Sequence, residues 1–118
     1  MDDSRAWVRD HLVRHALLSS FDTLVCREDA PRVKPAPDLY LEAISRLGLA
    51  ADQVIAFEDS HNGSLAAKRA GLWGIAVPNE ITATQDFSHA DGQLDSLAGI
   101  DLAGLAGRFG LAVKGQCL

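Results

Sequence analysis

The feature that most constrains the fold is a strand–helix–strand pattern in the middle of the chain. The apolar run VIAF at 54–57 has the composition of a buried strand, and WGIAVP at 73–78 has that of a second. Between them we expect a helix over about 62–70 that ends at Gly71, because glycine favours the backbone conformation that follows a helix. Two strands joined by one helix through short connections form a right-handed parallel unit. The sequence therefore predicts an α/β fold with a parallel sheet.

Three further elements are predicted before that unit. The first is a helix over 4–18, with Ser4 as its N-cap. The run FDTLVC at 21–26 has the composition of a short strand. Residues 27–38 should form a loop, because three prolines remove backbone donors and keep the residues before them extended. A second helix is expected to run from about Pro37 to Leu47.

A chain of 118 residues suits a single domain, 1–118. We divide it into a helical segment over 1–20, a βαβ region over 21–78 and a C-terminal segment over 79–118. The last segment carries weaker patterns, which predict a short strand or turn and one short helix. Residues 111–118 are expected to form a loose tail.

Composition and charge exclude several classes of partner. The net charge is -5 and no block of Lys and Arg offsets it, which argues against nucleic acid or an anionic membrane. No apolar run approaches the roughly 20 residues that span a bilayer. Cys26 and Cys117 are too few and too far apart for a disulfide scaffold, and Cys26 is expected to pack as a small apolar residue. We therefore expect a cytoplasmic protein with free thiols.

Two adjacent acids, Glu58 and Asp59, follow the first strand of the central pattern directly. In open parallel sheets, ligands gather beyond the carboxyl ends of the strands, and a helix N-terminus there favours anions. A pair of carboxylates can be neutralised by Mg²⁺, which takes oxygen ligands and keeps several waters. The alternative is that Asp59 or Ser60 only caps the following helix, and the two roles are compatible.

Lys34 is the second candidate site residue. Pro35 and Pro37 stiffen the backbone around it, so its ammonium is presented from a restrained loop and could neutralise a phosphate oxygen. Considered alone, Lys34 is better explained as a solvated surface lysine. Together with Glu58 and Asp59 it completes the set of parts that phosphoryl transfer uses: a cation, metal-binding acids and helix amides.

Two stretches, VKPAPDLYLEA and AFEDSHNGSLAAKRAG, resemble the third and fourth motifs of the haloacid dehalogenase-like phosphohydrolases. Within that superfamily the chain is most similar to the β-phosphoglucomutase-like branch, over roughly residues 4 to 98. The resemblance implies a three-layer, Rossmann-like α/β core, of which this chain would be the C-terminal portion. It also implies that Ala66, Ala67 and Ala70 let their helix lie close on the sheet.

The same resemblance implies roles for individual residues. Lys34 would act in catalysis by holding the phosphate, and Asp59 would ligate Mg²⁺. Glu58 would act at the metal beside Asp59, through water or behind the direct ligands. Support of the phosphate and close approach of the backbone would come from three residues at the helix start, namely Ser60, Asn62 and Gly63.

One part of the family pattern does not occur in the sequence. The first motif, Asp-x-Asp-Gly-Thr, carries the nucleophile and the general acid and base, and SFDTLV at 20–25 echoes it only superficially. The cap insertion that selects substrate is also missing. Without the central nucleophile strand, the predicted strand at 21–26 should have no neighbour, and open sheet edges would invite another chain. We therefore expect a fragment of a longer enzyme, a chain completed by a second polypeptide or a swapped copy, or a rearranged sheet.

The predicted parent reaction is Mg²⁺-dependent hydrolysis of a small phosphate ester, with a small phosphorylated metabolite as the partner. Sugar-phosphate mutation is the first alternative. A catalytically silent module that binds phosphate or metal, or that serves association as a homo-oligomer, is the second. A receiver-like signalling domain is a more distant alternative, which rests on four residues: Asp2, Asp3, Asp59 and Lys114.

Three histidines are further candidates for site residues. His11 and His15 have a spacing that can bind zinc, but no third ligand accompanies them, which favours packing or a solvated helix face. His61 stands beside the acids and could tune them, although projection into solvent is the preferred interpretation.

Overall fold

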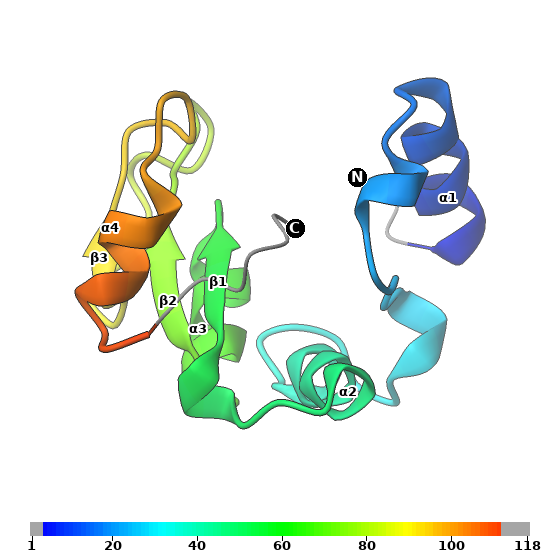
Figure 1. Ribbon diagram of the computed structural model, residues 1–118, viewed down its shortest axis with the longest axis horizontal. Coiled ribbons are helices and arrows are strands. Elements are labelled where there is room, and N and C mark those ends of the chain that lie inside the picture. Colours follow the sequence, from blue (N-terminus) through cyan, green and yellow to red (C-terminus); the bar gives the residue numbers. More distant parts are fainter. Residues whose placement is uncertain (1–3, 112–118) are drawn as a thin grey trace.

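The computed structural model describes residues 4–111, and its centre is a parallel three-stranded sheet (Figure 1). The strands are β1 (Ile55–Glu58), β2 (Trp73–Ala76) and β3 (Gly92–Gln93), in the order β1-β2-β3. β1 and β2 are parallel, as are β2 and β3. The predicted α/β class and the parallel arrangement are therefore confirmed.

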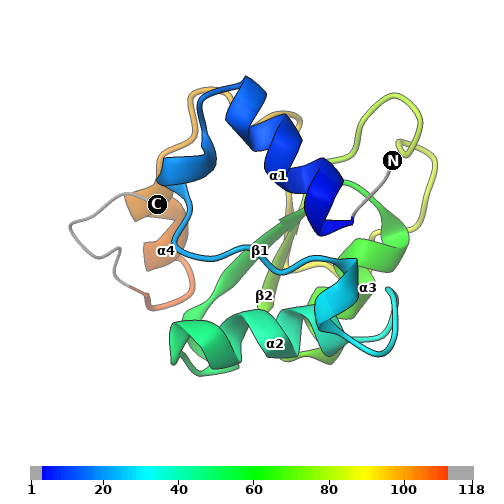
Figure 2. The same cartoon turned by 90° about the vertical axis from the view of Figure 1, so that its right-hand side faces the viewer.

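Helices cover both faces of this sheet. Helix α3 (His61–Arg69) packs against β1 and β2 from one side, and α4 (Leu102–Gly107) lies on the other side (Figures 1 and 2). Helix α2 (Asp38–Leu47) contacts α3 and belongs to the same helical layer. Beyond α4, the ring of Phe109 stacks on Trp73 with centroids 4.7 Å apart. The three layers that the family resemblance implied are therefore present.

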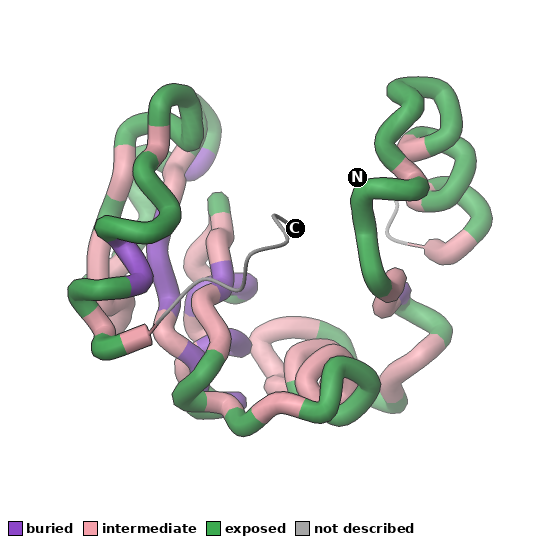
Figure 3. The backbone as a smooth tube through the Cα atoms, viewed as in Figure 1, coloured by how far each residue is buried: buried purple, intermediate pink, exposed green. Residues whose placement is uncertain are grey.

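The centre of the molecule is built from small residues on α3. Ala66 and Ala67 are fully buried and Ala70 is nearly so, and the buried stretches in Figure 3 follow α3 and β2. Because alanine has a single methyl group, α3 can approach the sheet closely, as the sequence predicted. Ala67 and Ala70 form one apolar cluster with Ala56 and Leu72.

Local signals define the ends of the two central helices. The Ser60 hydroxyl accepts a hydrogen bond from the backbone N–H of Gly63 at 3.1 Å, which caps α3. Gly48 ends α2 in the left-handed conformation, with φ of 67°, which costs glycine little. The boundaries predicted for these two helices are accordingly close to those observed.

Helix α1 (Arg5–Arg14) is shorter than predicted. Instead of continuing to residue 18, the chain turns at Ala16, which adopts φ of 54°. The backbone N–H of Leu17 then donates to the carbonyl of Leu12 at 2.9 Å, which closes the helix end. None of the residues of α1 is buried, so little tertiary packing favours a longer helix.

The prediction of a strand at 21–26 is wrong. Phe21 and Cys26 have extended backbones, but no strand forms between them. Figure 1 shows this segment and α1 apart from β1, and the sheet of the described chain has β1 as one edge. A strand is stabilised by hydrogen bonds to a neighbour, and within residues 4–111 none lies beside this segment. The sequence has the right composition for a strand here but lacks the partner.

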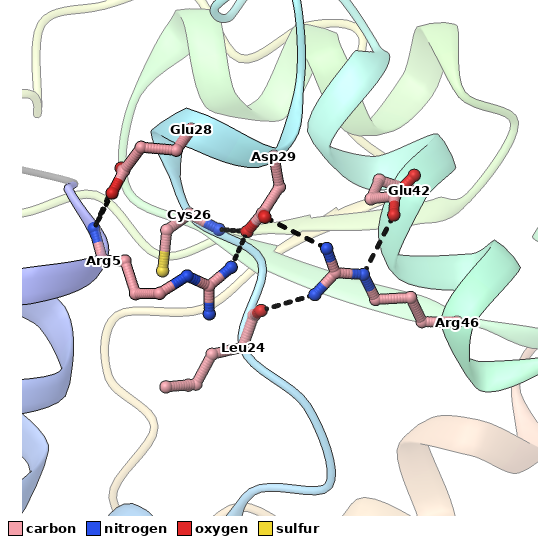
Figure 4. A network of polar contacts seen from close by, with 7 residues as sticks. All are labelled: Arg5, Leu24, Cys26, Glu28, Asp29, Glu42 and Arg46. Carbon is pink, nitrogen blue, oxygen red and sulfur yellow. Dashed lines mark hydrogen bonds and ion pairs between the residues drawn. The ribbon is translucent and has the colours of Figure 1, made fainter.

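Three short 3₁₀ turns connect the larger elements: η1 (Leu18–Ser20), η2 (Arg27–Asp29) and η3 (Ala51–Gln53). Within η2, the pKa of the Asp29 carboxyl lies below its usual range because it accepts the backbone N–H of Cys26 and is paired with two arginines. One of them, Arg5, comes from α1, and the other, Arg46, lies on α2 at 3.1 Å (Figure 4). These contacts attach the N-terminal arm, residues 4–26, to α2.

Cys26 is buried beside this network and is a free thiol. Burial raises the pKa of the Cys26 thiol, so it stays protonated and packs as a small apolar group, as expected. On α1, the ring of His11 stacks on the ring of Trp7, and its centroid lies 4.6 Å from the centroid of the His15 ring. Across residues 4–111, no cluster of three or more His, Cys, Asp or Glu side chains could hold a metal ion.

Several sequence predictions fall outside the described residues: those on Asp2, Asp3, Lys114 and Cys117, and all but the first residue of the predicted tail at 111–118. Of the helices in the described part of the chain, none has the length and apolar character to cross a membrane.

We predict that Ala67→Leu destabilises the fold by about 1–3 kcal/mol, because the larger side chain must push α3 away from the sheet. Ala6→Leu, at an exposed position of α1, is the matched control and should change the free energy of unfolding by less than about 0.5 kcal/mol. Urea unfolding followed by circular dichroism measures both. Equal stability of the Ala67→Leu variant and the unsubstituted chain would contradict close helix–sheet packing.

Candidate functional site

Glu58 is the last residue of β1 and lies at the carboxyl end of that strand, where ligands bind in open parallel sheets. Its side chain is only 11% exposed. One carboxylate oxygen, Oε1, accepts a hydrogen bond from the Lys34 ammonium at 2.6 Å and a second from the Tyr40 hydroxyl. A loop, a helix and a strand end therefore meet at this single oxygen.

Lys34 reaches Glu58 from the proline-rich loop before α2. Its side chain is 37% exposed, and its ammonium also lies 5.4 Å from the centre of the Tyr40 ring. The structure thus brings Lys34 to Glu58, one of the two acids predicted to share its ligand. The alternative of an unattached surface lysine is not what the structure shows.

Asp59, the second acid, points elsewhere. It is exposed, and its Oδ2 accepts a hydrogen bond of 3.3 Å from the side-chain amide of Asn79, which follows β2. The side-chain oxygen Oδ1 of Asn79 accepts hydrogen bonds from the backbone N–H groups of Ile81 and Thr82, both at 2.9 Å. These two hydrogen bonds fix the orientation in which Asn79 faces Asp59. Because Ser60 is the residue that caps α3, the carboxylate of Asp59 is not used as a cap.

Gly63 leaves room for Glu58. A Cβ atom at this position would lie 2.0 Å from Oε2 of Glu58, so any other residue would displace the carboxylate. Gly63 is buried, and its N–H is already used by the hydroxyl of Ser60. The close backbone approach predicted for Gly63 is therefore an approach to Glu58.

A pocket of about 420 Å³ opens at the start of α3. Its walls come from the helix start and from the loop after β2, and they consist of Ser60, His61, Asn62, Gln85 and Asp86. Of the three predicted support residues, Ser60 and Asn62 line this pocket, whereas Gly63 lies against Glu58. The sequence predicted the helix-side wall but not the loop-side wall.

His61 does not project freely into solvent, which corrects the preferred expectation. Its Nδ1 donates to the backbone carbonyl of Asp86 at 2.6 Å, and its own backbone N–H donates to the Gln85 side chain at 2.7 Å. Its ring also meets His89 edge-on, with centroids 5.1 Å apart. His61 therefore anchors the loop after β2 to the start of α3.

Tyr40 has the most strongly perturbed titration at the site. Burial, and then the negative charge of Glu58, raise the pKa of the Tyr40 phenol far above its usual range. The phenol therefore stays protonated and acts as a permanent donor to Glu58.

The oxygen ligands at this edge suit a hard cation. Asp59 offers an exposed carboxylate, the kind of group through which Mg²⁺ is held while it keeps waters. Glu58 is less available, since Oε1 already accepts two donors. Because these two hydrogen bonds occupy Oε1, Glu58 is better suited to support Asp59 than to bind the metal directly. This agrees with the indirect role that the resemblance implied for Glu58.

Sequence reasoning missed four residues of this region: Tyr40, Asn79, Gln85 and Asp86. Tyr40 follows Pro-x-Pro-Asp at helical spacing with Ile44, and that spacing indicated only an apolar helix face. A polar atom on such a face needs a partner when buried, which is the signal that could have pointed to a nearby acid. Asn79, Gln85 and Asp86 lie in a loop, where spacing carries little information.

Comparisons with known proteins show the family to which the chain belongs. The model of the haloacid dehalogenase-like hydrolases matches residues 2–77. The chain is 44% identical to YhcW of Bacillus subtilis (strain 168) over 97 residues, which cover 82% of this chain and 44% of YhcW. It is 38% identical to hexitol phosphatase B of Escherichia coli (strain K12), over 77% of this chain and 41% of that protein.

Among solved structures, CbbY from Rhodobacter sphaeroides in complex with phosphate superposes with a TM-score of 0.71 at 39% identity. The match covers 75% of this chain and 40% of CbbY. The chain thus spans less than half the length of these relatives. The family match covers more than half of the chain and includes Lys34, Glu58 and Asp59. The chain belongs to the haloacid dehalogenase-like hydrolases.

Proposed function

We propose that this chain is the C-terminal part of a Mg²⁺-dependent phosphohydrolase that acts on a small phosphate ester. The observation that carries the proposal is the 2.6 Å contact between Lys34 and Glu58. It brings a cationic loop to the strand end at which Asp59 and the start of α3 lie. A cation, an exposed carboxylate and a helix N-terminus at one edge are suited to bind and polarise a phosphoryl group.

The relatives support a phosphorylated small molecule as substrate. CbbY has been crystallised with phosphate, and a variant of it with xylulose-1,5-bisphosphate. Hexitol phosphatase B is by its name a phosphatase. Hydrolysis is therefore the first choice for this chain, and sugar-phosphate mutation remains the alternative.

Each site residue has a distinct task in this proposal. The Lys34 ammonium binds a non-bridging phosphate oxygen and stabilises the charge that builds up on it during transfer. Asp59 would hold Mg²⁺, which would neutralise phosphate charge when bound. Glu58 keeps Lys34 in place through their hydrogen bond and would assist Asp59 at the metal. Asn62 and Ser60 form the wall of the pocket beside the phosphate position, and Gly63 admits the Glu58 carboxylate.

The nucleophile must come from a segment outside this sequence, because no Asp-x-Asp-Gly-Thr motif occurs in it. Within the described chain, β1 pairs on one side only, with β2, and its other edge offers backbone groups to a further strand. We infer that a strand from a preceding segment, a companion chain or a swapped copy occupies this edge. A silent phosphate- or metal-binding module is the outcome if no such segment confers activity.

We predict no hydrolysis of a simple aryl phosphate ester by this chain alone, and Mg²⁺-dependent hydrolysis when it is co-expressed with a segment that carries the first motif. In the complemented protein, Asp59→Asn and Lys34→Met should each lower kcat/KM by about 10²-fold or more, as expected for a lost group that stabilises transition-state charge. Release of inorganic phosphate measures the reaction, and conversion between two sugar phosphates without release indicates the mutase.

The matched control is Asp52→Asn, which removes an exposed carboxylate away from the site and should leave the rate unchanged. Activity that survives Asp59→Asn in full would contradict the assigned metal ligand. Complementation that restores a folded protein but no turnover would favour the silent module.

A further inference from the structure

We propose that Tyr40 is a positioning residue of this site, which holds the Lys34–Glu58 pair in a fixed arrangement through both its hydroxyl and its ring. Its effect on phosphate binding rests on the function proposed above. Its effect on the pair itself does not, and the two can be measured separately.

Tyr40 touches both members of the pair. Its hydroxyl donates to Oε1 of Glu58, the oxygen that also accepts from the Lys34 ammonium. The same ammonium lies 5.4 Å from the centre of the Tyr40 ring, within the range in which a ring face attracts a cation. One side chain therefore constrains the anion by a hydrogen bond and the cation by its π-system.

Tyr40 is itself firmly held. It lies on α2 and packs against the buried cluster of Ala56, Ala67, Ala70 and Leu72. Lys34, by contrast, is partly exposed and loses more rotamer freedom than most side chains when it is fixed. A rigid neighbour that makes two contacts reduces the range of positions that the ammonium can sample.

The Glu58 carboxylate is confined from its other side as well. Oε2 lies against the backbone of Gly63, close enough that a Cβ there would overlap it. With Tyr40 on Oε1 and Gly63 beside Oε2, the carboxylate has one orientation to offer Lys34. In the described part of the chain, one ammonium donor of Lys34 is used on Glu58, and two remain for a phosphate oxygen.

Tyr40→Phe is the decisive variant for the proposal. It keeps the ring and its packing and removes only the hydroxyl, so a purely structural role would leave Lys34 as it is. The readout is a proton–carbon correlation NMR spectrum of the chain labelled with ¹³C-lysine, and the chain has three lysines: Lys34, Lys68 and Lys114. Lys34→Arg assigns the signal. A positioned lysine has two inequivalent ε-protons, whereas a mobile one averages them.

Lys68 is a matched control within the same spectrum. It pairs with Asp91 at 2.7 Å and lies 5.6 Å from the centre of the Trp73 ring, an arrangement of the same kind without a tyrosine hydroxyl. We expect Tyr40→Phe to collapse the inequivalence of the Lys34 ε-protons and to leave that of Lys68 unchanged. Glu58→Gln is the second variant and should loosen Lys34 in the same way. An unchanged Lys34 signal in folded Tyr40→Phe would overturn the proposal.

Titration with inorganic phosphate separates this inference from the proposed function. We expect phosphate to shift the Lys34 signal of the unsubstituted chain, and to do so about tenfold more weakly in Tyr40→Phe, a loss of the size of one hydrogen bond. If phosphate never shifts Lys34 but Tyr40→Phe still loosens it, the proposed function fails and the positioning role stands. If phosphate binds both proteins equally and Lys34 is equally ordered, the positioning role fails and the function stands.

Discussion

The contact between Lys34 and Glu58 joins two parts of the chain that are 24 residues apart. It attaches the proline-rich loop before α2 to the end of β1, which Asp59 and the start of α3 follow directly. Glu58 is largely buried and therefore needs a partner for its charge, and the ammonium provides one. A second contact holds the same loop, because the Arg69 guanidinium at the end of α3 donates to the Pro35 carbonyl at 3.3 Å.

Charged contacts hold α2 at both of its ends. At the N-terminal end, Arg32 pairs with Asp38 at 3.0 Å, and Asp38 lies in the first turn, where a negative charge suits the helix dipole. At the C-terminal end, Arg46 binds both Asp29 and Glu42. Tyr40 lies between these two ends and faces the buried cluster. Helix α2 is thus a rigid support from which Tyr40 reaches the strand end.

The N-terminal arm, residues 4–26, has no strand partner within residues 4–111. It is attached to α2 through Arg5, Asp29 and Arg46, and it lies apart from β1 (Figures 1 and 4). Trp7, Val13 and Phe21 remain exposed on it. In the proposed function, the segment that supplies the nucleophile would cover these exposed apolar side chains and the unpaired edge of β1.

The central βαβ unit could be predicted from sequence because its signals are local. Strand composition and the Ser60 cap each act within a few residues, and the structure confirms both. The close packing of the α3 alanines, which the family resemblance implied, is also present. Contacts between distant segments could not be read in this way. The strand expected at 21–26 depended on a neighbour, and the bond from Tyr40 to Glu58 spans 18 residues that no periodicity connects. The turn at Ala16 was missed because alanine rarely adopts a positive φ.

A double-mutant cycle on the free energy of unfolding tests the Lys34–Glu58 contact most directly. The cycle compares Lys34→Met, Glu58→Gln and the double variant with the unsubstituted chain by urea unfolding. Because Glu58 is largely buried and Lys34 is partly exposed, we expect a favourable coupling of about 1 kcal/mol. Effects that add to within about 0.3 kcal/mol would show that the two side chains do not interact, and the proposed site would then lack its cation.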